Sequence, residues 1–260
     1  MQIKAIVIIV ALVFISGLFP VSGQQRLDHS LEEAKRLWEL AVEAKGGRKR
    51  LRSVNSFAVI EAGTLNGVRN CDLYSLPDKF WRWVDLRPTV LGLSVDVVNR
   101  SLNRSYSTDH SHPDNPLTEE LKPETGEEEL ATVQLTYFLE TLWFKPNLVT
   151  SAKEFIGLKE FDVVEIKLRG MPVKIFLDKN THLPARVAYY STYNGRMFTW
   201  SDLSDYKSVN GILIPHKKRD DSGPRIALKI EVNPQFDPKA FERPAKIEDG
   251  PEQWRLKVGN

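Results

Sequence analysis

The clearest metal-ligand pattern in the chain is His110-Ser-His112-Pro-Asp114, which spells H-x-H-x-D. Two imidazoles and a carboxylate at this spacing can share one divalent ion. The zinc motif that opens in this way continues with a further histidine, where this chain has Asn115. The later histidines, His182 and His216, fall in predicted hairpins. We therefore expect a solvated polar loop here, with no metal.

Other catalytic patterns are missing from the sequence, which has no G-x-S-x-G, no G-x-G-x-x-G and no Walker lysine loop. Asp202 and Asp205 share one predicted strand, but their odd spacing directs them to opposite faces. Cys71 has no evident histidine partner, so we expect it to be a small buried apolar residue. These residues therefore give no support for acid–base or nucleophilic catalysis.

Aromatic side chains are crowded into three segments, and they are the more unusual feature. They are either the ordinary core or the wall of an apolar cavity that holds a lipid-like ligand. If a cavity exists, its candidate ligand-binding residues are Phe80, Trp81, Trp83, Phe138, Leu139, Leu142, Trp143, Tyr189, Phe198 and Trp200.

The first residues have the layout of a secretory signal. Lys4 precedes an uncharged apolar run, Ala5 to Phe19, and Val21-Ser22-Gly23 supplies small residues before Gln24. The run is shorter than the ~20 residues of a spanning helix. We expect cleavage after residue 23 and a periplasmic or secreted protein; an uncleaved anchor is the alternative.

Charge and cysteine content narrow the functional classes. Without the signal, the chain carries 35 basic against 34 acidic residues, because Lys4 leaves with it. This balance favours neither a nucleic-acid partner nor an anionic membrane surface. Cys71 is the only cysteine, so no intramolecular disulfide is possible, and no cysteine near the cleavage point could carry a lipid anchor.

Hydrophobic periodicity predicts an initial helix followed by strands. Ser30 and Glu33 form a capping box, an apolar face follows at helical spacing, and Gly46-Gly47 end the helix. Asn194-Gly195 and Asn210-Gly211 are hairpin signals. In 225–232, Ile226, Leu228, Ile230 and Val232 make one apolar face. The predicted strands are 56–62, 71–75, 79–86, 93–98, 161–168, 173–178, 185–191, 196–206, 212–217 and 225–232.

Two segments interrupt these strands. Asp109 to Glu129 is polar, acidic and contains proline, which is typical of a loop. A helix is expected from about Glu127 to Phe144, ended by Pro146. The pattern as a whole predicts an α+β, mainly β fold, in which one highly curved antiparallel sheet is covered by the N-terminal helix and this inserted helix.

The segment Leu76-Pro-Asp-Lys-Phe-Trp-Arg-Trp83 resembles the LolA-like carriers of outer-membrane lipoproteins. Looser similarities occur at Phe176-Leu-Asp178, at Asp205-Tyr206 and in the ending from Asn233 to Pro244. The resemblance implies an unclosed β-barrel with helices as a lid, acyl chains held in an apolar cavity, a protein that is not an enzyme, and no cofactor. The carriers often have Arg before the proline, where this chain has Leu76, which weakens the specific lipoprotein-sorting role.

These inferences predict an exported, non-enzymatic carrier of a lipid or acylated protein, with 24–245 as a LolA-like domain and 246–260 as a tail. An envelope membrane protein is a possible partner, and no nucleic acid is expected. The first alternative is a periplasmic sensor or interaction domain on the same fold. The second is a secreted metal-dependent hydrolase built on His110, His112 and Asp114.

Overall fold

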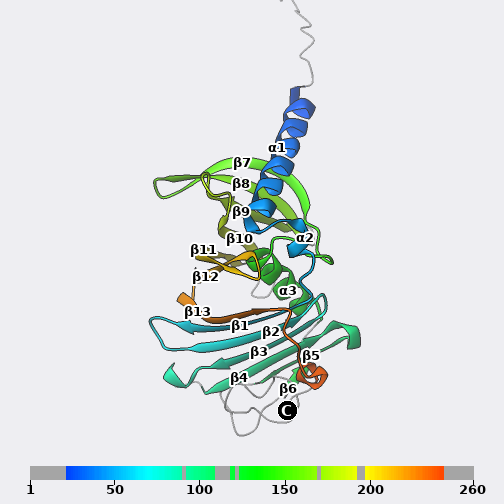
Figure 1. The fold of residues 1–260 in the computed structure, drawn as a ribbon, viewed down its shortest axis with the longest axis vertical. Coiled ribbons are helices and arrows are strands. Elements are labelled where there is room, and N and C mark those ends of the chain that lie inside the picture. The colour runs from blue at the N-terminus through cyan, green and yellow to red at the C-terminus, as the bar shows by residue number, and fades with distance from the viewer. Residues whose placement is uncertain are drawn as a thin grey trace, which may run out of the picture.

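The computed structural model describes residues 22–89, 92–108, 118–120, 123–168, 171–191 and 197–242. Within them lie the helices α1 (Ser22–Lys45), α2 (Arg48–Leu51) and α3 (Pro123–Tyr137), and the short 3-10 helix η3 (Pro238–Phe241) (Figure 1). The strands are β1 (Ser56–Gly63), β2 (Arg69–Ser75), β3 (Lys79–Asp85), β4 (Leu93–Asn99), β5 (Arg104–Thr108), β6 (Thr118–Glu120), β7 (Asn147–Ile156), β8 (Lys159–Leu168), β9 (Met171–Leu177), β10 (Pro184–Ser191), β11 (Met197–Val209), β12 (Ile212–Asp220) and β13 (Gly223–Val232).

All of these strands belong to one antiparallel sheet of two meanders. The order is β6-β5-β4-β3-β2-β1-β13-β12-β11-β10-β9-β8-β7, so β1 and β13 join the meanders and the sheet is not closed. The chain passes from edge strand β6 through α3 to the opposite edge strand β7. The predicted fold class, one open antiparallel sheet with an N-terminal and an inserted helix, is confirmed.

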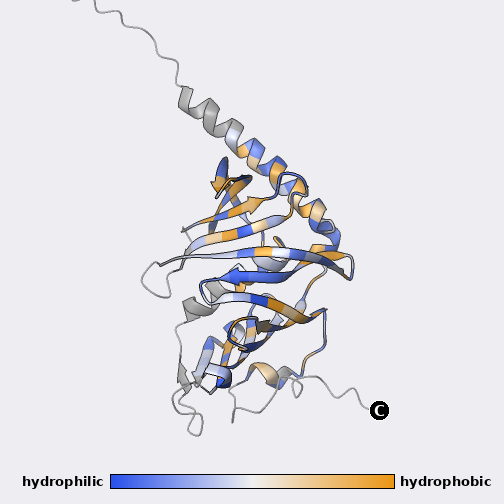
Figure 2. Cartoon of the chain, turned by 90° about the vertical axis from the view of Figure 1, so that its left-hand side faces the viewer, coloured by the Kyte–Doolittle hydropathy of each residue, from blue (hydrophilic) through white to orange (hydrophobic). Residues whose placement is uncertain are grey.

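The two faces of the sheet bury different side chains, because neighbours along a strand point in opposite directions. Phe57, Tyr74 and Phe80 lie in the same core as α1 and the end of α3. Trp81 and Trp83 lie in a second core with Phe241 of η3. Hydrophobic and hydrophilic residues alternate along the strands accordingly (Figure 2). We call the face that packs on α3 the inner face and the other the outer face.

The first helix has the predicted apolar face, but its start differs. Leu37, Trp38 and Ala41 are buried as expected. The helix begins at Ser22, so Ser30 is an internal residue and not a cap. Its hydroxyl instead accepts a hydrogen bond from the Ser151 amide at 3.1 Å, and Ser151 Oγ donates to the Ser30 carbonyl at 3.0 Å. Ser30 therefore fastens α1 to β7.

The predicted limits of the inserted helix, about Glu127 to Phe144, were wrong. It begins at Pro123 and ends at Tyr137, not Phe144, and β6 also lies in the segment that was expected to be a loop. The Phe138 and Leu139 amides both donate to the Gln134 carbonyl, at 2.7 and 2.9 Å, and Leu139 has a φ of 65°. A left-handed residue ends a helix, and beyond it Leu142 and Trp143 are mostly exposed.

Strand β13 also departs from the expected alternation. The register shifts between Ile60 and Glu61 of β1, so Leu228 is left in a bulge and is 52% exposed, while Ala227 packs on the inner core. One extra residue in a strand moves the side chains beyond it to the opposite face of the sheet. Strands β5 and β7 were not predicted. The Asn210-Gly211 turn is confirmed, with φ of 52° and 77°, whereas Asn194-Gly195 lies outside the described residues.

No helix among the residues that the structure describes is both long and apolar enough to cross a membrane. The expected signal up to residue 21, the cluster from His110 to Asp114 and the tail from residue 246 lie outside the described residues.

Candidate ligand-binding site

An aromatic cluster on the inner face holds the end of α3. The Phe57 ring of β1 lies 4.8 Å from the Tyr137 ring and 4.9 Å from the Phe138 ring, centre to centre. Tyr74 of β2 stacks on Phe57 at 6.0 Å and on Phe80 of β3 at 5.1 Å. These five residues form what we call the aromatic seat. Three strands and the end of one helix therefore meet on a continuous apolar surface.

A buried acid closes one side of this seat. Tyr137 Oη donates to Glu61 Oε1 at 2.7 Å, and Lys218 Nζ of β12 lies 2.8 Å from the same oxygen. Lys218 Nζ also lies 5.2 Å from the centre of the Tyr137 ring. Burial, and then the charge of Glu61, raise the pKa of Tyr137 well above its usual value, so its hydroxyl remains a donor. This contact joins α3 to β1 and β12.

Next to the seat, Asp72 of β2 is buried and fully engaged. Arg82 Nε and Nη2 donate to its two oxygens, each at 3.0 Å, and Tyr74 Oη donates at 3.1 Å. Burial alone would raise the pKa of the Asp72 carboxyl, but the Arg82 charge and these hydrogen bonds lower it. The carboxylate therefore orients Tyr74 within the aromatic seat.

The turn that follows α3 is held from the other side by Glu140. Its carboxylate accepts from Trp38 Nε1 at 3.1 Å and from Arg48 Nε at 2.6 Å, and Arg52 Nη2 lies 3.2 Å away. Burial acts against ionisation, but the Arg48 hydrogen bond and charge lower the pKa of Glu140. Residues just beyond α3 are thus tied to α1 and α2.

The ten predicted ligand-binding residues separate onto different surfaces. Phe80, Phe138 and Leu139 are in the inner core, with Tyr189 packed against it. Trp81 and Trp83 are in the outer core under η3, and Trp200 packs on a third cluster with Phe161 and Phe176. Leu142 and Trp143 are exposed by 54% and 60%. The side chain of Phe198 lies outside the described residues.

Sequence reasoning missed the centre of the seat, namely Phe57, Tyr74 and Tyr137, and the acid Glu61. One signal was present. Phe57, Val59 and Glu61 recur at a spacing of two along β1, which directs a carboxylate toward the same side as two core residues. A charged residue on a buried face indicates a partner, which here is Lys218.

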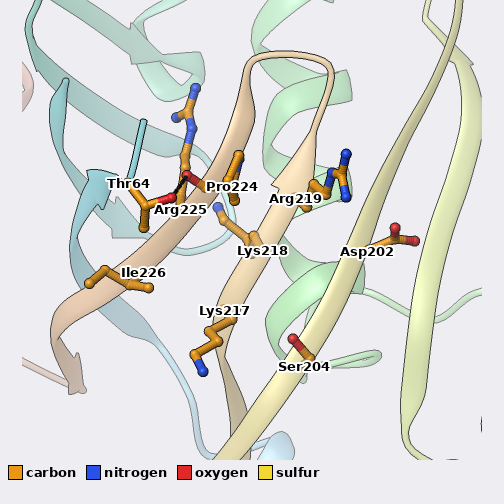
Figure 3. A pocket seen from close by; sticks show the side chains of 9 residues that line it. All are labelled: Thr64, Asp202, Ser204, Lys217, Lys218, Arg219, Pro224, Arg225 and Ile226. Carbon is orange, nitrogen blue, oxygen red and sulfur yellow. Dashed lines mark hydrogen bonds between the residues drawn. The ribbon is translucent and has the colours of Figure 1, made fainter. Parts of the chain in front are cut away.

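A pocket of about 390 Å³ lies across β11, β12 and β13 (Figure 3). Four of its lining residues are lysines or arginines, and none of the predicted ligand-binding residues is among them. Asp202 in this lining accepts hydrogen bonds from Arg186 at 2.5 and 3.0 Å. The lining residues are Thr64, Asp202, Ser204, Lys217, Lys218, Arg219, Pro224, Arg225 and Ile226.

The other candidate groups occupy structural positions. Cys71 is a buried cysteine in the outer core, and Leu76 is buried in the inner core. His182 has a φ of 56° in the turn between β9 and β10, and His216 lies on β12. Across the described ranges, no three His, Cys, Asp or Glu side chains are grouped to hold a metal.

Comparisons with known proteins find similarity in structure. No family model and no curated protein sequence matches the chain. A candidate outer membrane lipoprotein-sorting domain from Vibrio parahaemolyticus is 13% identical, with a TM-score of 0.40, over 83% of this chain and 97% of that one. A structure described as PNGF-II is 12% identical, with a TM-score of 0.28, over 74% of this chain and 30% of that one. The first of these is of the lipoprotein-sorting class that the sequence resembles.

Proposed function

We propose that this protein is an exported, non-catalytic carrier that holds a lipid or acylated ligand against the inner face of its sheet. The aromatic seat is the observation that supports this function. It presents Phe57, Tyr74 and Phe80 from adjacent strands as one apolar surface, and Tyr137 and Phe138 at the end of α3 pack on the Phe57 ring. An acyl chain needs such a surface, because its binding energy comes from buried CH₂ groups.

The position of α3 suits exchange between a closed and a loaded state. It bridges the two edge strands, and it contacts β3, β5 and β10 from both meanders (Figure 1). Withdrawal of Phe138 would leave an apolar surface that an acyl chain can replace. The carrier would thus bury its ligand in the space that the end of α3 fills in the free protein.

A fluorescent fatty acid tests this proposal. We expect micromolar or tighter binding, about −8 kcal/mol. The decisive pair is Phe80→Leu, in the seat, and Phe241→Leu, in the outer core, because both phenylalanines are 3% exposed. Each substitution should cost less than about 1.5 kcal/mol of stability. Only Phe80→Leu should weaken probe binding. We expect a loss of about threefold or more, which corresponds to the loss of one buried CH₂ contact.

Absence of probe binding to the wild-type protein, or equal effects of the two substitutions, would contradict the carrier. Export is checked separately by N-terminal sequencing, which should find a mature chain that begins near Gln24. An envelope membrane protein fits the same role as the donor or acceptor of the ligand.

A second candidate is an interaction or sensor domain on the same fold. The exposure of Leu142 and Trp143 favours it, since large apolar side chains on a surface mark contact sites. The two functions differ in the probe experiment, because an interaction domain has no need to bind a fatty acid.

A further inference from the structure

The turn after α3 carries exposed apolar side chains in a fixed position. The Thr141 amide donates to the Phe144 carbonyl at 3.1 Å, and the Phe144 amide donates to Thr141 Oγ1 at 3.2 Å. Leu142 and Trp143 occupy the tip between these bonds and are 54% and 60% exposed. Thr141 itself is fully buried. The tip is therefore anchored and presents its two side chains to the surroundings.

The basic segment that contains α2 is tied to the residue just before this turn. Arg48 and Arg52 bind Glu140, one residue before the turn, and so bring the basic segment 48–52 next to it. Lys49, Arg50 and Lys145 are exposed and form no ion pair within the described part of the chain; Arg50 Nη1 donates a hydrogen bond to the Gly46 carbonyl at 2.9 Å. Glu39 and Glu140 bind Arg48, and Glu43 on α1 lies beside Gly47.

We infer that Leu142, Trp143, Lys49, Arg50 and Lys145 form a surface that docks on a lipid bilayer containing anionic phospholipids. An indole and a leucine at the tip suit the boundary between headgroups and acyl chains. Exposed cations that form no ion pair within the described residues suit a negative surface. The overall charge of the chain is near neutral and hides this local excess.

The biological role of this docking surface rests on the proposed carrier function. Docking by this turn brings the end of α3, which covers the aromatic seat, to the bilayer where an acylated ligand is collected or delivered. The docking itself depends only on the exposed side chains and their charge.

Vesicle flotation tests the surface with the chain from Gln24 onward, so that the apolar signal cannot insert. We expect binding to phosphatidylcholine vesicles that contain phosphatidylglycerol, weaker binding to pure phosphatidylcholine, and loss of binding in high salt. Lys49→Gln with Arg50→Gln should weaken binding about 10- to 30-fold. Trp143→Ser should weaken it about tenfold or more.

Matched controls distinguish binding through this surface from binding through charged or hydrophobic residues elsewhere on the protein. Lys217→Gln with Arg219→Gln removes two cations from the outer face, and Phe155→Ser removes an aromatic ring that is 66% exposed on β7. Both controls should float like the wild type. Absence of flotation with anionic vesicles, or equal losses in the controls, would overturn the inference and leave an acidic protein surface as the partner.

Binding of the soluble fatty-acid probe, measured without vesicles, separates the two proposals. It should be unchanged in the Lys49→Gln, Arg50→Gln protein. Probe binding without flotation would refute only the docking surface, whereas flotation without probe binding would refute only the carrier function.

Discussion

Lys45, the last residue of α1, is fully buried, and its Nζ has no hydrogen-bond partner among the described residues. Lys45 Nζ lies 5.0 Å from the centre of the Tyr206 ring. Burial lowers the pKa of Lys45 well below the usual value. Folding therefore opposes the charged form, which an unfolded lysine keeps up to a pH of about 10.4.

Replacement of this lysine should stabilise the protein. Below the pKa of the unfolded chain, folding must remove the Lys45 proton, and this cost grows as the pH falls toward the lower folded pKa. Lys45→Met should raise the free energy of unfolding by about 1 kcal/mol or more at pH 6, and by less at pH 10. Urea unfolding at both pH values measures it, with exposed Lys49→Met as the control. A gain that does not depend on pH would contradict this account.

Loss of the hydrogen bond between Tyr137 and Glu61 should lower the free energy of unfolding. Tyr137→Phe removes the donor to Glu61 Oε1, and Glu61 Oε2 already has no partner among the described residues. We expect a loss of about 1–3 kcal/mol. Tyr74→Phe should cost less, because Asp72 keeps both bonds from Arg82. Urea midpoints compare the two variants, and an equal or larger loss for Tyr74→Phe would refute the distinction.

At the scale of elements, α1 ends where it meets the β11–β12 hairpin. Gly46 has a φ of 123°, and a Cβ there would lie 2.3 Å from the Gly211 carbonyl oxygen. This contact sets how closely the helix approaches the sheet, because backbone on both sides leaves nothing that can rotate away. Gly46 therefore both ends the helix and allows its close contact with the β11–β12 hairpin.

Gly46→Ala should therefore cost about 3 kcal/mol or more, from the left-handed backbone and the clash together. Gly157→Ala is the matched control: its φ is 60°, and nothing lies within 4 Å of the added Cβ. It should cost only about 1–2 kcal/mol. Thermal unfolding measures both, and similar losses would show that the helix can shift without penalty.

At the scale of the whole molecule, one core joins the two meanders. The inner core contains Phe57 and Tyr74 from the first meander and Val164 and Ile175 from the second. The β1–β13 pairing continues the backbone hydrogen bonds across the junction. Neither meander has a complete inner core without the other.

We therefore expect the two meanders to unfold together. Phe57→Ala should cost about 3–5 kcal/mol and shift the transitions seen by tryptophan fluorescence and by far-UV circular dichroism equally. Exposed Phe155→Ala should change stability by less than about 0.5 kcal/mol. Separate shifts of the two signals would mean that the meanders are independent units.

The sequence by itself determined the element types over most of the chain, because alternation and turn chemistry are local. The strand pattern, the apolar face of α1 and the Asn210-Gly211 turn all follow from neighbours along the chain. The end of α3 does not, since apolar residues continue to Phe144 and only the backbone at Leu139 shows where the helix stops.

The site was decided by tertiary structure. Phe80 and Trp81 are adjacent and both aromatic, yet they belong to opposite faces, and the second face becomes a core where η3 packs on it. Trp143 reads as a core residue from its neighbours but is exposed, because a left-handed turn separates it from α3. The partners of Glu61 come from residues 137 and 218, far along the chain. Contacts over such separations depend on how the meanders meet, which no local pattern records.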